Sequence, residues 1–511
     1  MDPHLEQMMR QALASQEALE ISRRRQQGFG KPIISGVVGN IRVVAVGSRI
    51  KYSPNWKFFT DFVLEHLKDE IGRNWDIQAQ RDGKAHPLFE WLKALQQVSD
   101  ENKRLDRLVY EAHFGGYLGA LWRLGYALYL IEHHDQKDDN LIKRLRVPRS
   151  FNAAYHETQV AAAFAVAGYR ISLAELYRTS NAKPEFWATS SKGVRYAVEA
   201  KCKDGWRNNF ADQQAFFAEL RQWVRHQIHK CSSKKLENAV YVWELSLEED
   251  LSEGDLQSIY ASIQVFLNEA SSMTIGGKPV GSAYVIVSNN SDVLTNERRT
   301  NRRTMMLFGF RLDGWVENGS QVEIETAFDS HDQHRDLHHL LECLSEVDEV
   351  PQSFDPRATV VDELGIERST EIQIGQSIKY PDADGVERSG KILDATAAGD
   401  KVFLVVQSDS RQSIVSVPLT PIEQKLVTKF GNSAFGKPEK KKNNIDGDFL
   451  KLYDWFLEVY KAYDREALLR QIPRHPRFAE IEQMGYLEMV IRVAREVTKA
   501  AMASSGRPGQ V

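Results

Sequence analysis

The sequence predicts an α/β protein in which helices flank a central sheet, with a mainly helical region before it and a small β-barrel plus helices after it. Three observations lead to this prediction. Apolar strands alternate with amphipathic helices between residues 194 and 288. Helical periodicity dominates residues 28–148. Short strands separated by turn residues recur at regular spacing between residues 372 and 419, a pattern typical of a small antiparallel barrel.

Length and composition are those of a multidomain globular protein. The 511 residues are enough for about three domains, and 42% hydrophobic residues can supply their cores. The net charge of -4 gives no global sign of nucleic-acid binding, so any surface for a polyanion must be a local patch. Three cysteines without a C-x-x-C pair argue against a disulfide framework or a thiolate zinc site and favour a reducing, cytoplasmic location.

We expect no targeting or membrane segment. The N-terminus has no basic region followed by an apolar core. The most apolar stretch, residues 114–131, contains Arg123 and several glycines, which favours a buried helix packed closely at its glycines.

The changes in composition along the chain predict six segments. They are a helical arm at 1–27, a mainly helical N-terminal domain at 28–148, an α/β domain at 149–346, an acidic linker at 347–371, a small β-barrel at 372–420 and a C-terminal helical region at 421–511.

The α/β domain contains the pattern on which a functional prediction can rest. Glu157 opens an alanine-rich helix that ends at Gly168. Pro184-Glu185 stands at the head of an extended run, and residues 194–202 form a strand with near-strict alternation. Glu199 and Lys201 lie two residues apart on that strand, so their side chains leave the same face.

The order of these residues resembles the PD-(D/E)XK nuclease superfamily, with Pro184-Glu185 and Glu199-Ala-Lys201 as the motif. The resemblance covers about 50 residues closely, and the motif itself is short and degenerate. It departs from the family at Glu185, where an aspartate is usual. The resemblance implies a restriction-endonuclease-like central sheet over residues 149–346.

The resemblance also implies the role of each residue. Glu157, Glu185, Glu199 and Lys201 would be catalytic. Glu185 and Glu199 would be the main ligands of Mg²⁺, with Mn²⁺ as an alternative, and Glu157 an additional or water-mediated ligand. Lys201 would orient the attacking water, and the reaction would be hydrolysis of a phosphodiester bond.

Basic residues near this motif are candidate contacts to nucleic acid. Lys203 and Arg207 follow the Glu-Ala-Lys strand, and Arg298 and Arg299 belong to the densest basic cluster of the region. DNA is favoured over RNA by the resemblance alone, and restriction, repair or defence against foreign nucleic acid are the matching roles. A protein partner or a homo-oligomer remains open, and no membrane is expected.

Two other interpretations remain open. Glu199 and Lys201 also suit a solvated edge strand, and Glu157 suits the positive end of a helix. The competing function is a catalytically inactive nuclease-like scaffold that binds nucleic acid or a protein partner, for which the substitution at Glu185 is the best support.

Overall fold

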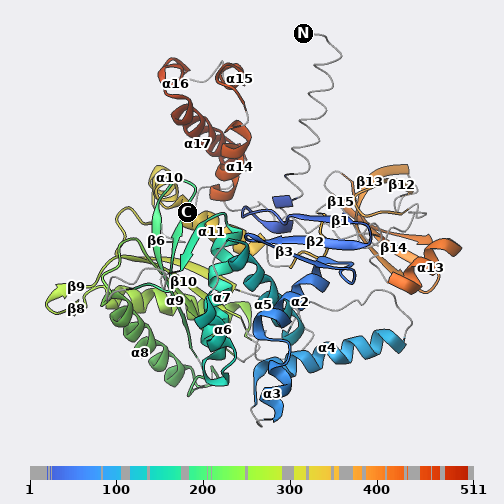
Figure 1. The fold of residues 1–511 in the computed structure, drawn as a ribbon. Helices are drawn as coiled ribbons and strands as arrows, with labels where there is room; N and C mark the ends of the chain where they lie inside the picture. Colours follow the sequence, from blue (N-terminus) through green and yellow to red (C-terminus); the bar gives the residue numbers. More distant parts are fainter. Residues whose placement is uncertain are drawn as a thin grey trace. The chain divides into compact units, whose positions relative to one another are not determined.

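The computed structural model is mixed α/β and separates into two compact units, residues 1–312 with 339–439, and residues 313–338 with 440–511 (Figure 1). The structure describes residues 20, 23–24, 26–81, 85–104, 116–134, 138–173, 183–203, 205–208, 210–247, 251–290, 304–317, 322–346, 350–355, 372–381, 387–408, 411–430, 434–435, 449–461, 463–471 and 478–504. Within these ranges, no helix combines the length and the apolar character that crossing a membrane requires.

The first unit begins with a three-stranded antiparallel sheet and a group of helices. The strands are β1 (Ser35–Val38), β2 (Ile41–Val46) and β3 (Arg49–Ser53), in that order. The helices that follow are α2 (Phe59–Ile71), α3 (Trp75–Arg81), α4 (Pro87–Arg104), α5 (Gly116–His133) and α6 (Asp139–Leu145).

Helix α5 is the apolar stretch expected to be a buried helix, and nearly all of its side chains are buried. Its close packing is visible at Gly125, where an added Cβ would lie 2.8 Å from Val63 Cγ1 and 2.9 Å from Val63 O of α2. The glycine therefore lets the two helix backbones approach each other, as the sequence predicts.

A six-stranded mixed sheet forms the centre of the first unit. Its order is β11-β10-β7-β6-β5-β4. The strands are β4 (Arg170–Leu173), β5 (Phe186–Thr189), β6 (Arg195–Cys202), β7 (Ala239–Glu244), β10 (Ala283–Asn289) and β11 (Thr304–Phe310). Strands β6, β7 and β10 are parallel, and the remaining neighbours pair antiparallel. A small hairpin, β8 (Thr274–Ile275) and β9 (Lys278–Pro279), precedes β10.

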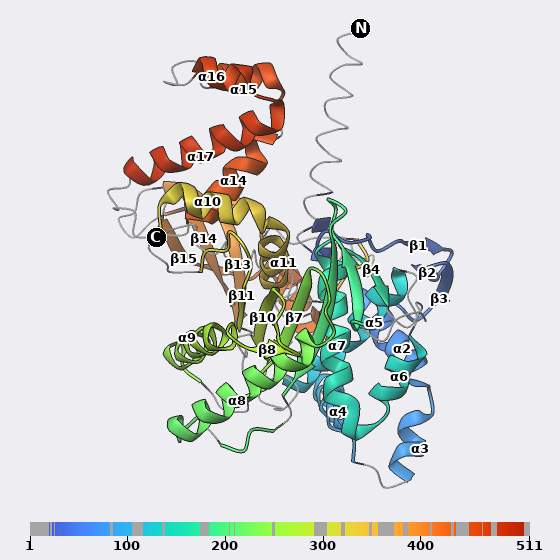
Figure 2. The ribbon, with the colours of Figure 1, turned by 90° about the vertical axis from the view of Figure 1, so that its left-hand side faces the viewer.

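Helices cover both faces of this sheet (Figure 2). Helices α8 (Gln213–Ser232) and α9 (Glu253–Ala270) contribute to an apolar core with Tyr241 and Trp243 of β7. Helix α7 (Pro148–Val166) packs on the other face, where the rings of Phe164 and Phe186 meet edge to face at 5.5 Å. The helix begins at Pro148, where the missing N–H of a proline costs nothing in the first turn.

The segment that the sequence predicts to be a small β-barrel is a curled antiparallel half-barrel. It consists of β12 (Ser377–Pro381), β13 (Glu387–Ala398), β14 (Lys401–Ser408) and β15 (Arg411–Pro418), paired in sequence order. Helix α13 (Pro421–Phe430) follows. The core of the half-barrel includes Ile392, Leu404 and Val406.

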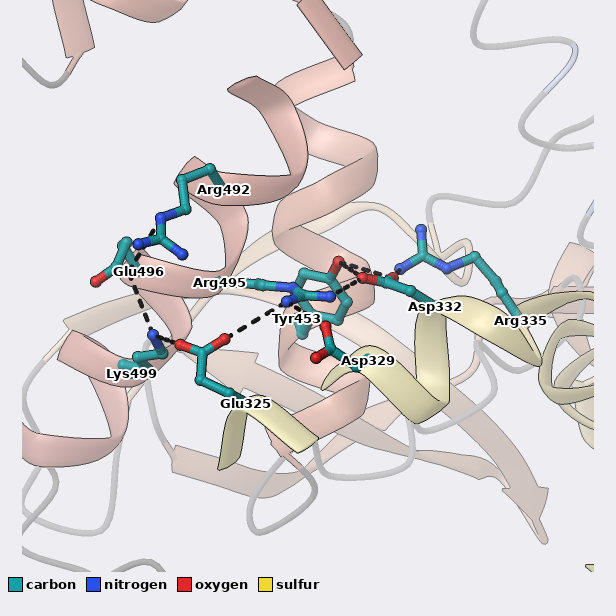
Figure 3. A network of polar contacts seen from close by, with 9 residues as sticks. All are labelled: Glu325, Asp329, Asp332, Arg335, Tyr453, Arg492, Arg495, Glu496 and Lys499. Atoms are coloured by element: carbon teal, nitrogen blue, oxygen red, sulfur yellow. Dashed lines mark hydrogen bonds and ion pairs between the residues drawn. The ribbon is translucent and has the colours of Figure 1, made fainter. Parts of the chain in front are cut away.

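The second unit is helical and is held together by an apolar core and a polar network. Its helices are α10 (Ile324–Gln333), the start of α11 (Arg335–Glu346), α14 (Phe449–Lys461), α15 (Arg465–Gln471), α16 (Phe478–Gln483) and α17 (Tyr486–Ser504). Arg495 of α17 pairs with Asp329 at 2.8 Å and also with Asp332 (Figure 3). Tyr453 of α14 donates to Asp332 at 2.8 Å, so one carboxylate ties three helices together.

Candidate active site

Glu185 and Glu199 lie next to each other on paired strands. Phe186 of β5 is the partner of Val198 of β6, and the Glu185 amide donates to the Val198 carbonyl at 3.0 Å. Continuing this antiparallel register by one residue brings Glu185 beside Glu199. The two carboxyl groups lie within hydrogen-bonding reach of each other.

Lys201 lies between the two carboxylates. Its ammonium pairs with Glu185 and lies 3.0 Å from Glu199 Oε2. The alternation of β6 places Glu199 and Lys201 on one face, as predicted, and the contacts show that they share one polar site.

Lys234 is the member of this site that the sequence did not indicate. It follows α8, and its ammonium pairs with Glu199 and donates to the Lys183 carbonyl at 2.9 Å. The side chain of Glu199 is fully buried, whereas that of Lys234 is 29% exposed, so the site opens to solvent on the lysine side.

The pKa values of the two carboxyl groups are shifted in opposite directions. Burial and the neighbouring Glu185 carboxylate raise the pKa of Glu199 to about 7. Burial also acts to raise the pKa of Glu185, but its hydrogen bond with Glu199 and its attraction to Lys201 outweigh burial and lower that pKa. The pKa of Lys201 is raised despite burial, because both carboxylates favour its charged form.

Glu157 of α7 lies near this pair but has its own partner. Arg144 of α6 contacts Glu157 Oε2 at 2.6 Å. Burial raises the pKa of Glu157, Arg144 opposes the rise, and repulsion from Glu185 adds to it. Glu157 therefore lies within electrostatic range of Glu185, while its carboxylate is held by an arginine.

The basic residues predicted to contact nucleic acid do not all lie in the same environment. Lys203 lies 3.0 Å from Glu219 Oε1 of α8. The Arg207 amide donates to the same glutamate at 3.0 Å, and the Arg207 residue itself is exposed. Trp206, which lies between these two residues in the sequence, donates from its indole nitrogen to the Leu245 carbonyl at 2.7 Å and packs on the apolar core beside α8. Arg298 and Arg299 lie outside the described residues.

A shallow cleft of about 460 Å³ adjoins Lys234 and supplies positive charge that the sequence prediction missed. Its lining includes Trp187, Arg195, Lys234, Lys235 and Glu237. The Arg195 guanidinium lies 4.0 Å from the centre of the Trp187 ring. Arg195 and Lys235 are about 40 residues apart in the sequence and meet because β6 and the end of α8 are neighbours. No local sequence pattern could have paired them.

The carboxylate oxygens of Glu185 and Glu199 are suitable ligands for a hard divalent cation. Glu185 Oε2 is buried and receives no hydrogen bond within the described residues, and Glu199 Oε2 has the Lys201 ammonium 3.0 Å away. Carboxylate oxygens are the ligands that Mg²⁺ and Mn²⁺ prefer, and a cation relieves the repulsion between two carboxylates.

A second group of possible metal ligands lies in the N-terminal helices. His66 and Glu70 of α2 and Glu132 of α5 have ligand atoms within 4.8 Å of one another. Lys51 Nζ lies 3.8 Å from Glu70 Oε1, and Arg49 pairs with Glu132. These two cations already neutralise the carboxylates, so the group is an internal ion-pair cluster as it stands.

Comparison with known proteins gave no match to a family model, to a curated protein or to a solved structure.

Proposed function

We propose that this chain is a magnesium-dependent nuclease of the PD-(D/E)XK type that hydrolyses phosphodiester bonds, with DNA favoured over RNA as its substrate. One observation carries the proposal. The partly buried Glu185 and the fully buried Glu199 form a carboxylate pair bridged by Lys201, and the pKa of Glu199 is raised to about 7. A carboxylate pair with one strongly raised pKa and a lysine beside it is typical of a catalytic or metal-binding site.

The connection of the central elements supports the proposal. Helix α7 is followed by the antiparallel strands β4, β5 and β6, then by helix α8 and the parallel strand β7. A restriction-endonuclease-like domain would carry its acidic residues on this set of elements. The four residues of the predicted motif lie on α7, at the head of β5 and on β6.

Each side chain has a role in this proposal. Glu185 and Glu199 would hold Mg²⁺, which when bound supplies Lewis acidity and a more acidic water. Glu199 would release its proton on loading, since its pKa lies near neutrality. Lys201 would orient the water and balance charge at the phosphate, and Lys234 would steady Glu199.

The basic cleft beside Lys234 offers a place for the phosphate backbone. Arg195 and Lys235 would contact phosphates, and Trp187 would provide a flat surface at the same place. Lys235→Ala should weaken DNA binding uniformly across sequences and reduce the slope of log affinity against log salt by about 1. An unchanged salt slope would remove this cleft from the proposal.

The decisive experiment is cleavage of single- and double-stranded DNA and RNA with and without Mg²⁺ or Mn²⁺. Glu199→Gln and Lys201→Met should each lower cleavage by at least about 100-fold, as expected for loss of a metal ligand or a charge-stabilising group. Glu269→Gln is the matched control, because Glu269 pairs with Arg221 on the surface of α8 and α9. Wild-type cleavage by the folded double variant Glu199→Gln/Lys201→Met contradicts the proposal.

A second function has its own support. Lys201 and Lys234 already balance the charges of Glu185 and Glu199, and Arg144 holds Glu157. A catalytically inactive scaffold that binds nucleic acid or a protein partner would keep such an arrangement without a metal. Oligonucleotide binding without cleavage in either metal would favour this scaffold function.

A further inference from the structure

A cavity lies on the face of the central sheet opposite the Glu185–Glu199 pair. It has a volume of about 140 Å³ and is lined by α5, by α7 and by the carboxyl ends of β6, β7 and β10. One water needs about 10–15 Å³ of such space, so the cavity is large enough for a small organic ligand. The crevice at the carboxyl ends of parallel strands is where open α/β sheets bind ligands.

The strand side of the cavity has its polar groups satisfied internally. Glu244 accepts hydrogen bonds from the Ser246 and Asn290 amides, both at 2.8 Å, and from Ser288 Oγ at 2.6 Å. Asn289 Oδ1 accepts from the Leu247 amide at 2.9 Å. These groups therefore offer little to a ligand.

The helix side has polar groups without partners. The hydroxyls of Tyr126 and Tyr155 and the amide nitrogen of Gln159 are buried and make no hydrogen bond in the part of the chain that the structure describes. Tyr126 is 7% exposed and Tyr155 is 4% exposed. Each unsatisfied buried donor is costly, so three in one cavity wall require an explanation.

The two tyrosine rings are fixed by aromatic neighbours. Tyr126 meets Phe59 edge to face at 5.9 Å, and Tyr155 meets Trp91 at 5.5 Å. Their hydroxyls are therefore preorganised. Arg123 of α5 adds a positive charge to the same wall. The rest of this wall is mostly apolar, with Ala127, Leu130, Val160, Ala163 and Phe164, and it also includes Asn152 and His156, whose imidazole hydrogen-bonds with the Val242 carbonyl.

We propose that this cavity binds a small molecule with an apolar body and one oxyanion head, which accepts hydrogen bonds from Tyr126, Tyr155 and Gln159. Three donors in one cavity wall match an acceptor group such as a carboxylate or a phosphate monoester. The apolar wall matches a short hydrocarbon body. This inference goes beyond nuclease activity and does not depend on it.

Calorimetric titration of the full chain without metal or nucleic acid tests the proposal. Octanoate and octyl phosphate distinguish the two oxyanion sources, and 1-octanol supplies the same body without the charge. At least one oxyanion should bind saturably and at least about tenfold more tightly than octanol, the difference expected for a charge-assisted hydrogen bond. The absence of saturable binding by either oxyanion, or equal binding of octanol, overturns the proposal and leaves a hydrated cavity only.

Two variants locate the binding. Ala163→Phe would fill the cavity and should abolish binding, whereas Ala153→Phe, on the exposed side of the same helix, should not. Binding that survives in Ala163→Phe would place the ligand elsewhere and overturn the proposal.

Tyr155→Phe separates ligand recognition from folding. It removes a buried hydroxyl that has no partner, so the melting temperature without ligand should stay the same or rise. Affinity for the bound oxyanion should nevertheless fall about tenfold. A variant that melts higher and binds as tightly as the wild type would exclude Tyr155 as a contact.

Discussion

Raising the pH should destabilise the metal-free protein through Glu199. This carboxyl has a pKa of about 7 in the folded chain against 4.5 in its ordinary state. Between these values the unfolded chain has lost the proton and the folded chain retains it. At Glu199 the folded state therefore binds more protons, and the contribution of Glu199 to the free energy of unfolding falls as pH rises through this window.

The magnitude follows from the two pKa values. A rise in the pKa of Glu199 from 4.5 to about 7 corresponds to about 3 kcal/mol of unfolding free energy. This value is not reduced for screening by solvent, because the side chain is fully buried. The lowered pKa of Glu185 acts below its ordinary value, and the raised pKa of Lys201 acts far above neutrality. Neither therefore contributes within the window of Glu199. The lowered pKa values of His86 and His156 add stability as pH rises through the same window, so the contribution of Glu199 is measured as the difference between a variant and the wild type.

Denaturant unfolding in a chelator, from about pH 4.5 to about pH 8, measures this loss. Glu199→Gln has no proton to lose, so its unfolding free energy should gain about 3 kcal/mol relative to the wild type across the window. Glu269→Gln is the surface control, and its curve should run parallel to that of the wild type. A constant difference between Glu199→Gln and the wild type would show that Glu199 is not held protonated, and the reasoning would fail.

Three further results are expected. Magnesium affinity, measured by titration calorimetry, should fall about tenfold per pH unit below about pH 7 because the cation competes with the Glu199 proton, and a pH-independent affinity would contradict this. Gly125→Ala should cost about 1–3 kcal/mol in denaturant unfolding, because its Cβ would overlap α2, whereas Gly36→Ala, with nothing within 4 Å, should be close to neutral. Arg495→Met should cost about 2–3 kcal/mol in the unfolding of the second unit, because it strips partners from the carboxylates of α10. Arg492→Met, which breaks a pair within α17, should cost less than about 1 kcal/mol, and equal costs would refute the role given to Arg495.

The elements around the site were predictable because their signals are local. The alternation of residues 194–202 predicts β6 and the shared face of Glu199 and Lys201, and both are present. The start of α7 was missed, although Pro148 at the first helical position is a local signal that could have found it.

The partners of the site residues were not predictable in the same way. Lys234 reaches Glu199 across 35 residues of sequence, and a lysine after a helix is common on any surface. Arg144 lies in a run of basic residues before α7, and the packing of α6 on α7 directs its side chain to Glu157. Tertiary contacts, which local periodicity does not encode, decide which cation each carboxylate receives.

The division of the second unit into residues 313–338 and 440–511 has a consequence for biosynthesis. Helix α10 leaves the ribosome before its partners, because roughly a hundred residues that belong to the first unit are translated in between. At about 5–20 residues per second, Phe328 waits roughly ten seconds for the rings of Phe449 and Tyr453 that later bury it. The apolar side of α10 is therefore a nascent-chain surface that a chaperone can recognise while the half-barrel is still being made.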